Sequence, residues 1–367
     1  MKPSAFDYER PSNKDAALAS LASYGGRAKV LAGGQSLLAM LNLRLVSTER
    51  LIDVGRLNEL KYIRTTSDEL RIGALTTHNA ILLSPEVATH CPIMTEAYRE
   101  VAHHSIRNRG TFGGSLCHND PAAEMPLVVQ LLGGSLVASS TRGERVIPAD
   151  QFFRGYFATA LVDDELLTEI RVPLPPRGHG WSFQEISQRK GDFALVAAGA
   201  MLTIEKGVCR NVRLGFRNVG ETISRAKAVE AKIEGQTPNP QLFSSVAVEA
   251  MRSVKPPSDI HADADYRRDL VKVLTGKEFV AKANRIEGVN PPRKDVAELP
   301  EFKNDWWEQA FIAQLPTGVA LAPINWGLVI NDITEALQKA IYKNATPEEA
   351  GKALYNTLEQ RAKDNQL

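Results

Sequence analysis

The residues best suited to chemistry in this chain are two glycine pairs flanked by hydroxyl side chains. The first pair lies in Ala32-Gly33-Gly34-Gln35-Ser36, between a predicted strand at Lys29 to Ala32 and a predicted helix at Leu37 to Leu45. Because glycine has no Cβ, the backbone can come close to a ligand, and amide groups at a helix N-terminus can converge on phosphate oxygens. A tight turn between strand and helix explains the same residues, so this loop alone leaves both interpretations open.

The second pair lies in Arg107-Asn108-Arg109-Gly110-Thr111-Phe112-Gly113-Gly114-Ser115, which adds basic and hydroxyl side chains. Two such loops could hold both phosphates of one dinucleotide. The patterns G-x-G-x-x-G, G-x-x-x-x-G-K-[ST] and G-x-S-x-G are absent, since Leu116 and Cys117 follow Ser115. These absences exclude a Rossmann NAD domain, a P-loop NTPase and an α/β-hydrolase.

Histidines and cysteines offer weaker candidates. His103 and His104 could bind a metal or carry protons, but adjacent residues diverge on a helix, which favours ordinary surface histidines. Cys117 could be reactive beside the second loop, although burial as a small apolar residue is the favoured interpretation. With only Cys91, Cys117 and Cys209 and no C-x-x-C pair, the chain encodes neither a zinc nor a self-contained iron–sulfur site. We predict reduced thiols, no metal site and no catalytic side chain.

Composition narrows the class of protein further. The chain has 367 residues, 44 Lys+Arg and 43 Asp+Glu, for a net charge of +1. This balance argues against a nucleic-acid partner, and the longest apolar stretch, Ala194 to Ile204, is too short to span a membrane. The N-terminus lacks the apolar core of a secretory signal, so we expect a cytoplasmic protein.

The elements that must position the loops form an α+β pattern, with a strand-rich half before a helix-rich half. Strands are expected near Arg71 to Leu75, Ser135 to Ser139, Glu165 to Pro173, Ser182 to Ser187, Ala194 to Ile204 and Val208 to Arg217, followed by helices from Arg225 to Asn284. Proline-rich breaks at Pro173 to Gly180 and Val289 to Lys294 separate regions. We predict four parts: residues 1–57, 58–175, 176–288 and an appended helical tail, 289–367.

Five stretches together resemble one family. They are Ala-Gly-Gly-Gln-Ser-Leu-Leu-Ala-Met-Leu-Asn-Leu-Arg-Leu (32–45), Ile-Gly-Ala-Leu-Thr-Thr-His (72–78), Ile-Arg-Asn-Arg-Gly-Thr-Phe-Gly-Gly-Ser-Leu (106–116), Asn-Asp-Pro-Ala-Ala-Glu (119–124) and Gly-Asp-Phe-Ala-Leu-Val (191–196). In order and spacing, residues 1 to about 285 resemble the FAD-binding medium subunit of molybdenum hydroxylases. That family includes aerobic carbon monoxide dehydrogenase and the flavin portion of xanthine dehydrogenase.

The resemblance implies a two-subdomain FAD-binding fold with two glycine loops, then a C-terminal domain of antiparallel sheet and helices. It implies that FAD is held by Ala32, Gly33, Gly34, Gln35, Ser36, Leu37, Val101, Ala102, Thr111, Phe112, Gly113, Gly114, Ser115, Glu124 and Phe193. Glu124 stands where the family usually has an aspartate that contacts a ribose hydroxyl. Phe193 aligns beside the isoalloxazine, with core packing in the following strand as its alternative. His78 either lies near the cofactor or caps the next helix.

The implied function is electron transfer within a complex. A molybdopterin-binding large subunit oxidises the substrate, a [2Fe-2S] small subunit relays electrons, and FAD passes them to an acceptor such as NAD or a quinone. This chain departs from the family at Gln184-Glu185, where family members often carry a basic residue near the flavin. The reduction potential of the flavin therefore cannot be inferred from the family. A stand-alone FAD oxidoreductase is the alternative enzyme.

Two further features stand apart from the flavin motifs. Arg267 and Arg268 could pair across a subunit interface or remain solvated helix charges. The tail, from Gly318 through Trp326 to Ala350, resembles the C-terminal end of an extracellular sugar-type solute-binding protein, which makes a solute-binding function a remote alternative. A fusion or a docking extension would explain such a tail.

Overall fold

The computed structural model describes residues 2–176, 178–286, 352–357 and 360. The chain divides into two compact units, Met1–Pro291 and Pro292–Leu367. In the second unit, residues 352–357 and 360 are helical, and the rest of the predicted tail lies outside the described residues. Trp306, Trp307 and Trp326, with most of the stretch that resembles a solute-binding protein, also lie outside the described residues.

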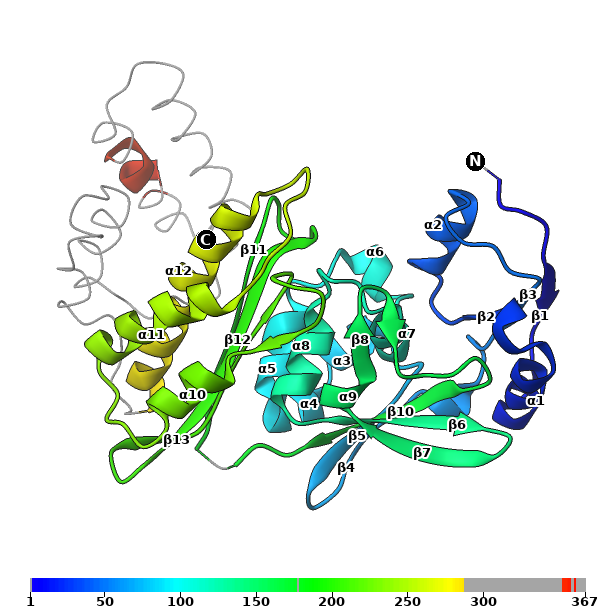
Figure 1. Cartoon of the computed structure of the whole chain (residues 1–367), viewed down its shortest axis with the longest axis horizontal. Helices are drawn as coiled ribbons and strands as arrows, with labels where there is room; N and C mark the ends of the chain where they lie inside the picture. Colours follow the sequence, from blue (N-terminus) through cyan, green and yellow to red (C-terminus); the bar gives the residue numbers. More distant parts are fainter. Residues whose placement is uncertain (1, 177, 287–351, 358–359, 361–367) are drawn as a thin grey trace. The chain divides into compact units, whose positions relative to one another are not determined.

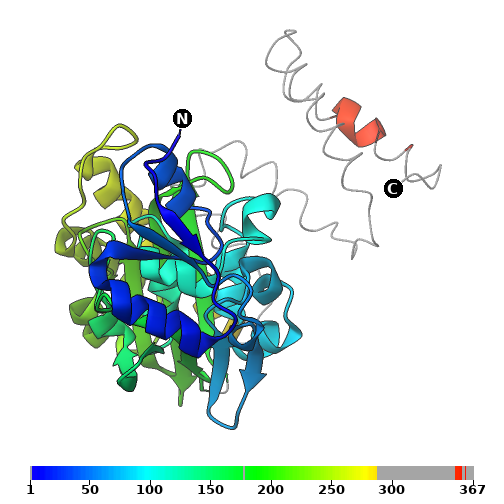
Figure 2. The same ribbon diagram turned by 90° about the vertical axis from the view of Figure 1, so that its right-hand side faces the viewer.

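The first unit begins with a small parallel sheet in the order β1-β3-β2. Its elements are β1 (Asp7–Glu9), α1 (Lys14–Tyr24), the short 3-10 helix η1 (Gly25–Arg27), β2 (Ala28–Leu31), α2 (Leu37–Asn42) and β3 (Arg50–Asp53). Asn13 caps α1 by accepting from the amide of Ala16 at 2.8 Å, which accounts for where that helix starts. Figure 2 brings this N-terminal part, in blue, to the front.

A five-stranded antiparallel sheet follows, in the order β4-β5-β10-β6-β7. Its strands are β4 (Ile63–Thr65), β5 (Glu69–Gly73), β10 (Leu166–Pro173), β6 (Ser135–Ser140) and β7 (Gly143–Pro148). Between β5 and β6 the chain forms a run of short helices: α3 (His78–Leu82), α4 (Pro85–His90), α5 (Pro92–Tyr98), α6 (His104–Arg107), α7 (Phe112–His118) and α8 (Glu124–Leu131). Pro92 is the first residue of α5 and follows the end of α4 by two residues, so this proline separates the two helices.

The remaining short elements complete this region. They are η2 (Asn58–Leu60), α9 (Ala149–Phe152) and the two-stranded pair β8 (Phe153–Gly155) and β9 (Ala158–Thr159).

The last part of the first unit is a four-stranded antiparallel sheet, followed by three helices that pack on the face turned away from α5 and α8. It consists of β11 (Gly180–Ser187), β12 (Ala194–Glu205), β13 (Val208–Arg217), β14 (Ser224–Arg225), α10 (Lys227–Ile233), α11 (Pro240–Ser253) and α12 (Ala264–Ile286). Figure 1 shows α5 and α8 between the two larger sheets and α10 to α12 outside the second sheet. The predicted α+β fold is confirmed.

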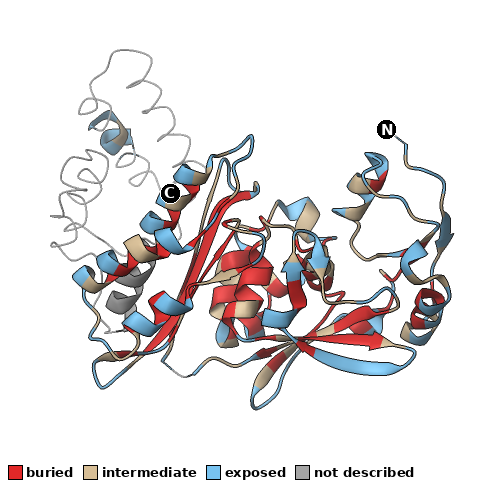
Figure 3. Ribbon diagram, in the orientation of Figure 1, coloured by how far each residue is buried: buried red, intermediate tan, exposed pale blue. Residues whose placement is uncertain are grey.

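Burial explains why the layers hold together. β12 is buried along ten successive residues because helices cover both of its faces, and Figure 3 shows this red stripe beside buried α8. Arg267 of α12 is also fully buried, donating to the Leu195 carbonyl at 2.5 Å and to Asp259 at 2.7 Å. The expectation of a solvated charge is therefore wrong for Arg267, whereas Arg268 pairs with Asp265 at the surface.

Among the described helices, none is long and apolar enough to cross a membrane.

Candidate functional site

Both glycine loops occur where a strand or bridge gives way to a helix. Residues 32–36 connect β2 to α2, and Thr111 is the N-cap of α7, accepting from the amide of Gly114 at 3.1 Å. Two backbone bonds tie the second loop to the connection between β5 and α3: Phe112 donates to the Thr76 carbonyl at 2.9 Å, and Gly113 donates to the Ala74 carbonyl at 2.8 Å. The second loop is thus held rigidly by the end of β5.

The two loops touch at Gly33. A Cβ at this residue would lie 2.2 Å from the carbonyl oxygen of Arg109 and 2.8 Å from the Cα of Gly110. Gly34 has a φ of +73°, in the left-handed region that favours glycine. The glycine pair therefore serves the approach of one loop to the other, a reason that the ligand-based interpretation did not include.

A cavity of about 790 Å³ lies beside the joined loops. Its volume is in the range of cofactor sites, which suits a ligand the size of a dinucleotide. Of the residues predicted to hold FAD, all but Phe112 line it: Ala32, Gly33, Gly34, Gln35, Ser36, Leu37, Val101, Ala102, Thr111, Gly113, Gly114, Ser115, Glu124 and Phe193. The Phe112 side chain instead packs in the core against Tyr98, with ring centroids 6.3 Å apart.

The loops differ in the donors that they offer. Within the described chain, the amides of Gly33, Gly34, Gln35 and Ser36 donate to no protein acceptor. In the second loop, the amides of Phe112, Gly113 and Gly114 are already engaged, which leaves the hydroxyls of Thr111 and Ser115. Backbone amides that have no acceptor within the protein and lie beside a cavity can donate to anionic oxygens. The first loop is therefore better suited than the second to bind a pyrophosphate through its backbone.

An acidic group forms part of the wall. Glu124 is the first residue of α8 and is 8% exposed. Burial raises the pKa of Glu124 to about 7, and the negative charges of Asp120 and Glu100 add to that rise. Near neutrality this carboxyl can therefore donate as well as accept a hydrogen bond, which suits a sugar hydroxyl.

The turn after α5 meets the loop before β12 at the cavity. Arg107 donates from Nη1 to the carbonyls of Val101 and Ala102, at 2.7 Å each, and Ala102 has a φ of +43°. Phe193 is 69% exposed, so the alternative of core packing is wrong for this ring. An aromatic face held at the rim of a cavity is available to stack on a planar ligand.

His78 and Cys117, which both line the cavity, are uncharged near neutral pH. Thr77, and not His78, caps α3, accepting from Ala80 at 3.2 Å, so the capping alternative for His78 is wrong. His78 lines the cavity, and burial lowers its pKa to about 4, which keeps the ring neutral. Burial raises the pKa of the Cys117 thiol to about 12, so no thiolate forms there. His103 and His104 are exposed, as the sequence favoured.

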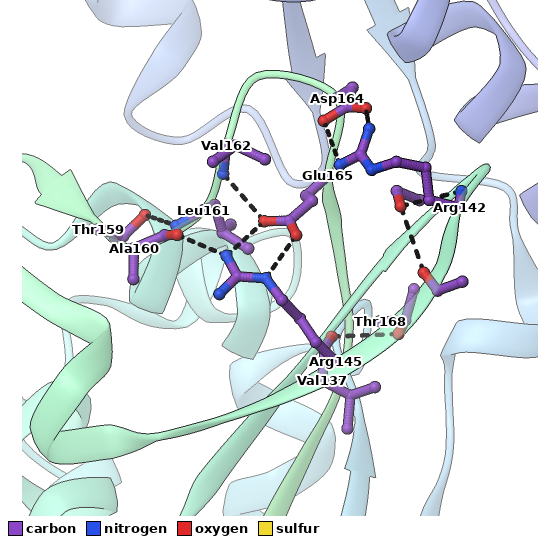
Figure 4. Close-up of polar contacts among 12 residues, drawn as sticks. Val137, Arg142, Arg145, Thr159, Ala160, Leu161, Val162, Asp164, Glu165 and Thr168 are labelled. Carbon is purple, nitrogen blue, oxygen red and sulfur yellow. Dashed lines mark hydrogen bonds and ion pairs between the residues drawn. The ribbon is translucent and has the colours of Figure 1, made fainter.

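The cavity also has a wall that sequence reasoning missed, from Phe157 to Leu167. Glu165 anchors it by accepting from Arg145 Nε at 2.6 Å, from Nη2 at 2.8 Å and from the Val162 amide at 2.9 Å (Figure 4). Arg145 also binds the Ala160 carbonyl at 2.7 Å, and it lowers the pKa of Glu165. No local motif marks this loop, because an ion pair between β7 and the start of β10 fixes it.

No group of three His, Cys, Asp or Glu side chains among the described residues could hold a metal ion.

An α+β fold with two glycine loops, free amides, an aromatic side chain at the rim and a cavity large enough for a dinucleotide defines a protein that binds a nucleotide cofactor. Comparison with known proteins makes the class specific. Residues 4–175 match the FAD binding domain in molybdopterin dehydrogenase, and residues 181–281 match the CO dehydrogenase flavoprotein C-terminal domain.

Individual relatives that cover about three quarters of this chain agree with these domains. The chain is 37% identical over 287 residues to caffeine dehydrogenase subunit beta of Pseudomonas sp. (strain CBB1), covering 78% of this chain and 97% of that one. It is 35% identical over 275 residues to the carbon monoxide dehydrogenase medium chain of Afipia carboxidovorans, covering 75% and 95%. The structure of carbon monoxide dehydrogenase from Hydrogenophaga pseudoflava matches with a TM-score of 0.76 and 34% identity, over 78% of this chain and 99% of that chain.

The chain belongs to the family of FAD-binding medium subunits of molybdenum hydroxylases. It is an FAD-dependent oxidoreductase subunit, and the residues of the cavity fit its cofactor.

Proposed function

We propose that this subunit receives electrons from a [2Fe-2S] small subunit and passes them through FAD to NAD or a quinone, in a complex whose molybdopterin-binding large subunit oxidises the substrate. The observation that carries the proposal is the cavity of about 790 Å³ beside the free amides of the first loop, since it provides a cofactor site within this chain. FAD, when bound, accepts electrons singly and passes them on in pairs.

Each proposed FAD contact has a distinct task. The amides of Gly33 to Ser36 and the hydroxyls of Thr111 and Ser115 bind the pyrophosphate, while Glu124 binds a sugar hydroxyl. Val101, Ala102 and Phe193 border the ring system, where the exposed Phe193 stacks and excludes water from one face. The Phe112 side chain contributes only through the core that supports its loop.

The cysteines support a division of labour among chains. The whole sequence has three cysteines, fewer than the four that a [2Fe-2S] cluster takes from one chain, and all three are free. This supports the proposal that the [2Fe-2S] cluster belongs to another chain. Free, unpaired thiols also favour a reducing compartment, and on that basis we propose the cytoplasm.

Co-purification and rapid mixing test this proposal. The complex carrying the tagged full chain should contain FAD together with acid-labile sulfide, iron and molybdenum in chains of their own. After anaerobic reduction, mixing with NAD and with a soluble quinone in separate experiments identifies the acceptor by the return of flavin absorbance. A chain that purifies alone with FAD and turns over without iron would instead be a stand-alone FAD oxidoreductase.

A further inference from the structure

Arg217 of β13 is a buried cation on the face of the second large sheet that α8 covers. It lies directly opposite Ala197 of β12, and paired residues of antiparallel strands project from the same face. Ala197 belongs to the core that includes residues of α5 and α8. A Cβ at Gly215, two residues before Arg217, would lie 2.8 Å from Cδ1 of Leu127 in α8. The guanidinium therefore leaves the sheet on the side of the flavin cavity.

The contacts of Arg217 lead to the turn between α7 and α8. Its Nη2 donates to Oδ1 of Asn119 and to the backbone carbonyl of Asp120, at 2.6 Å each. Asp120 is one of the residues that line the cavity. A single hydrogen bond thus joins the sheet to a residue of the cavity wall.

Asn119 extends this contact to the turn between β8 and β9. It is 0% exposed and caps α7 with a φ of +48°. Its Nδ2 donates to the carbonyls of Gly155 at 2.7 Å and Ala158 at 2.9 Å, and its own carbonyl accepts from the amide of Phe157 at 3.3 Å. Because Oδ1 accepts from Arg217, this one side chain ties three segments together.

The turn held in this way presents an aromatic pair to the cavity. Phe157 has a φ of +54°, a left-handed conformation that is unfavourable for a bulky side chain, and it is 54% exposed. Its ring centroid lies 5.1 Å from that of His118, and both residues line the cavity. Such a backbone conformation persists only where surrounding contacts impose it. The bonds from Asn119 to both sides of Phe157 supply those contacts.

Packing alone does not call for an arginine at position 217. The side chain is buried, its Nε has no hydrogen-bond partner, and it forms no ion pair within the described residues. Glu185 of β11 lies in the same row, on the other side of Ala197, so two strand spacings of about 10 Å in total separate it from Arg217. Replacing a buried charge by an apolar side chain of similar size is often neutral for stability. The two oxygen acceptors in the α7–α8 turn are therefore the reason for the guanidinium.

We propose that Arg217 is a positioning residue of the flavin site, which fixes the α7–α8 turn directly and the β8–β9 turn through Asn119. The residues that these turns hold against the cavity are Asp120, His118 and Phe157. The proposal rests on FAD occupying this cavity and is independent of the electron donor and acceptor proposed above. It gives the C-terminal domain a contribution to the site besides the loop before β12.

Fluorescence titration of the full-length apoprotein with FAD tests this role. Arg217→Met should weaken FAD binding at least about tenfold, because hydrogen bonds from a charged donor are lost and both turns are released. Hydrogen exchange of the amides in residues 153–159 should become faster in the same variant. Arg217→Lys, which keeps a charged donor, should restore part of the affinity.

Arg213→Met is the matched control for general damage to the sheet. Arg213 lies on the same strand, donates from Nη1 to the Leu131 carbonyl at 2.5 Å, and lines a separate small cavity. This variant should bind FAD like wild type and keep the exchange of residues 153–159 unchanged. Equal loss of FAD in Arg213→Met and Arg217→Met would overturn the proposal, because any buried arginine of β13 would then serve.

A second variant tests the contact to the β8–β9 turn if Arg217→Met does not fold. Asn119→Asp keeps the oxygen that accepts from Arg217 and removes only the donor to Gly155 and Ala158. Faster exchange in residues 153–159 with weaker FAD binding supports the proposal, and wild-type exchange and affinity overturn it. A wild-type apoprotein that binds no FAD would instead refute the assignment of the cavity, so the two failures are distinguishable.

Discussion

Gly33 is the residue at which the two glycine loops come closest. The atom that a side chain would meet is the backbone carbonyl of Arg109, which cannot rotate away as a flexible side chain could. The loop–loop contact and the cofactor cradle therefore depend on the same missing Cβ. This links local backbone packing directly to the geometry of the FAD site.

We expect Gly33→Ala to push the loops apart and to lose FAD. Overpacking of this kind typically costs about 1–3 kcal/mol in stability, and the free amides would no longer point at one ligand. Flavin absorbance after gel filtration measures occupancy, and urea denaturation measures stability. Gly276→Ala is the control, because a Cβ there meets nothing within 4 Å and alanine favours a helix. Full FAD occupancy in Gly33→Ala would show that the loop contact does not organise the site.

The raised pKa of Glu124 makes stability depend on pH in a defined direction. Between pH 4.5 and 7, the unfolded chain loses this proton while the folded chain retains it. The free energy of unfolding therefore falls as pH rises through that window, by up to about 3 kcal/mol at 1.36 kcal/mol per pKa unit.

Glu124→Gln should remove that dependence. We expect the apoprotein of the variant to gain stability relative to wild type as pH rises from 4.5 to 7.5, with the gain complete above pH 7. Urea denaturation at several pH values measures the difference, and Glu205→Gln serves as an exposed control. A constant difference between Glu124→Gln and wild type at every pH would rule out a raised pKa in the folded state.

At the scale of elements, the turn between α5 and α6 depends on one arginine. Arg107 of α6 reaches back to the carbonyls of Val101 and Ala102, and Ala102 adopts a left-handed conformation that alanine disfavours. A Cβ on Gly191, from the loop before β12, would lie 2.8 Å from the same Ala102 carbonyl. Two segments distant in sequence thus meet at a strained residue beside the cavity.

We expect Arg107→Ala to release this turn and weaken FAD binding. Losing hydrogen bonds from a charged donor costs about 1.5–3 kcal/mol, and FAD affinity should fall at least tenfold. Fluorescence titration of the apoprotein with FAD measures the change. Arg99→Ala, an exposed arginine of the preceding turn, should bind like wild type. Adding Ala102→Gly should restore part of the affinity by relieving the strain; no rescue would mean that Arg107 acts by another route.

The sequence predicted elements best where chemistry and local pattern coincide. Gly33-Gly34 interrupts an apolar strand before a helix, so that loop could be placed from residue types alone. β1 was missed because Asp7–Glu9 is short and polar, and long-range contacts hold it: Tyr8 and Arg10 both bond to Asp53 of β3. The wall from Phe157 to Leu167 was missed for the same physical reason. The roles of individual residues toward FAD stay predictions.

At the scale of the whole molecule, the cavity draws on a limited part of the chain. Every residue that lines it lies between Leu21 and Phe193, and the second large sheet contributes only the loop Gly191 to Phe193. One face of that sheet packs with α10 to α12 in a core of its own, which includes Val196, Phe216 and Val271. The opposite face packs in the core of the preceding part of the chain, through Ala197 and Met201. The C-terminal domain thus supports the site chiefly by placing one loop.

Truncation after Gly288 is therefore expected to leave the flavin site intact. The two family matches end by residue 281, the chain divides at Pro291, and a proline-rich boundary is where few contacts normally cross. The truncated and full chains should bind equal FAD, with melting temperatures that differ little. Three tryptophans, Trp306, Trp307 and Trp326, argue for caution in choosing the readout, because aromatics of this size each bury roughly 150 Å² or more when packed. A lower melting temperature with full FAD content would mean that the tail covers apolar surface without serving the site, whereas loss of FAD would show that residues 289–367 belong to the functional fold.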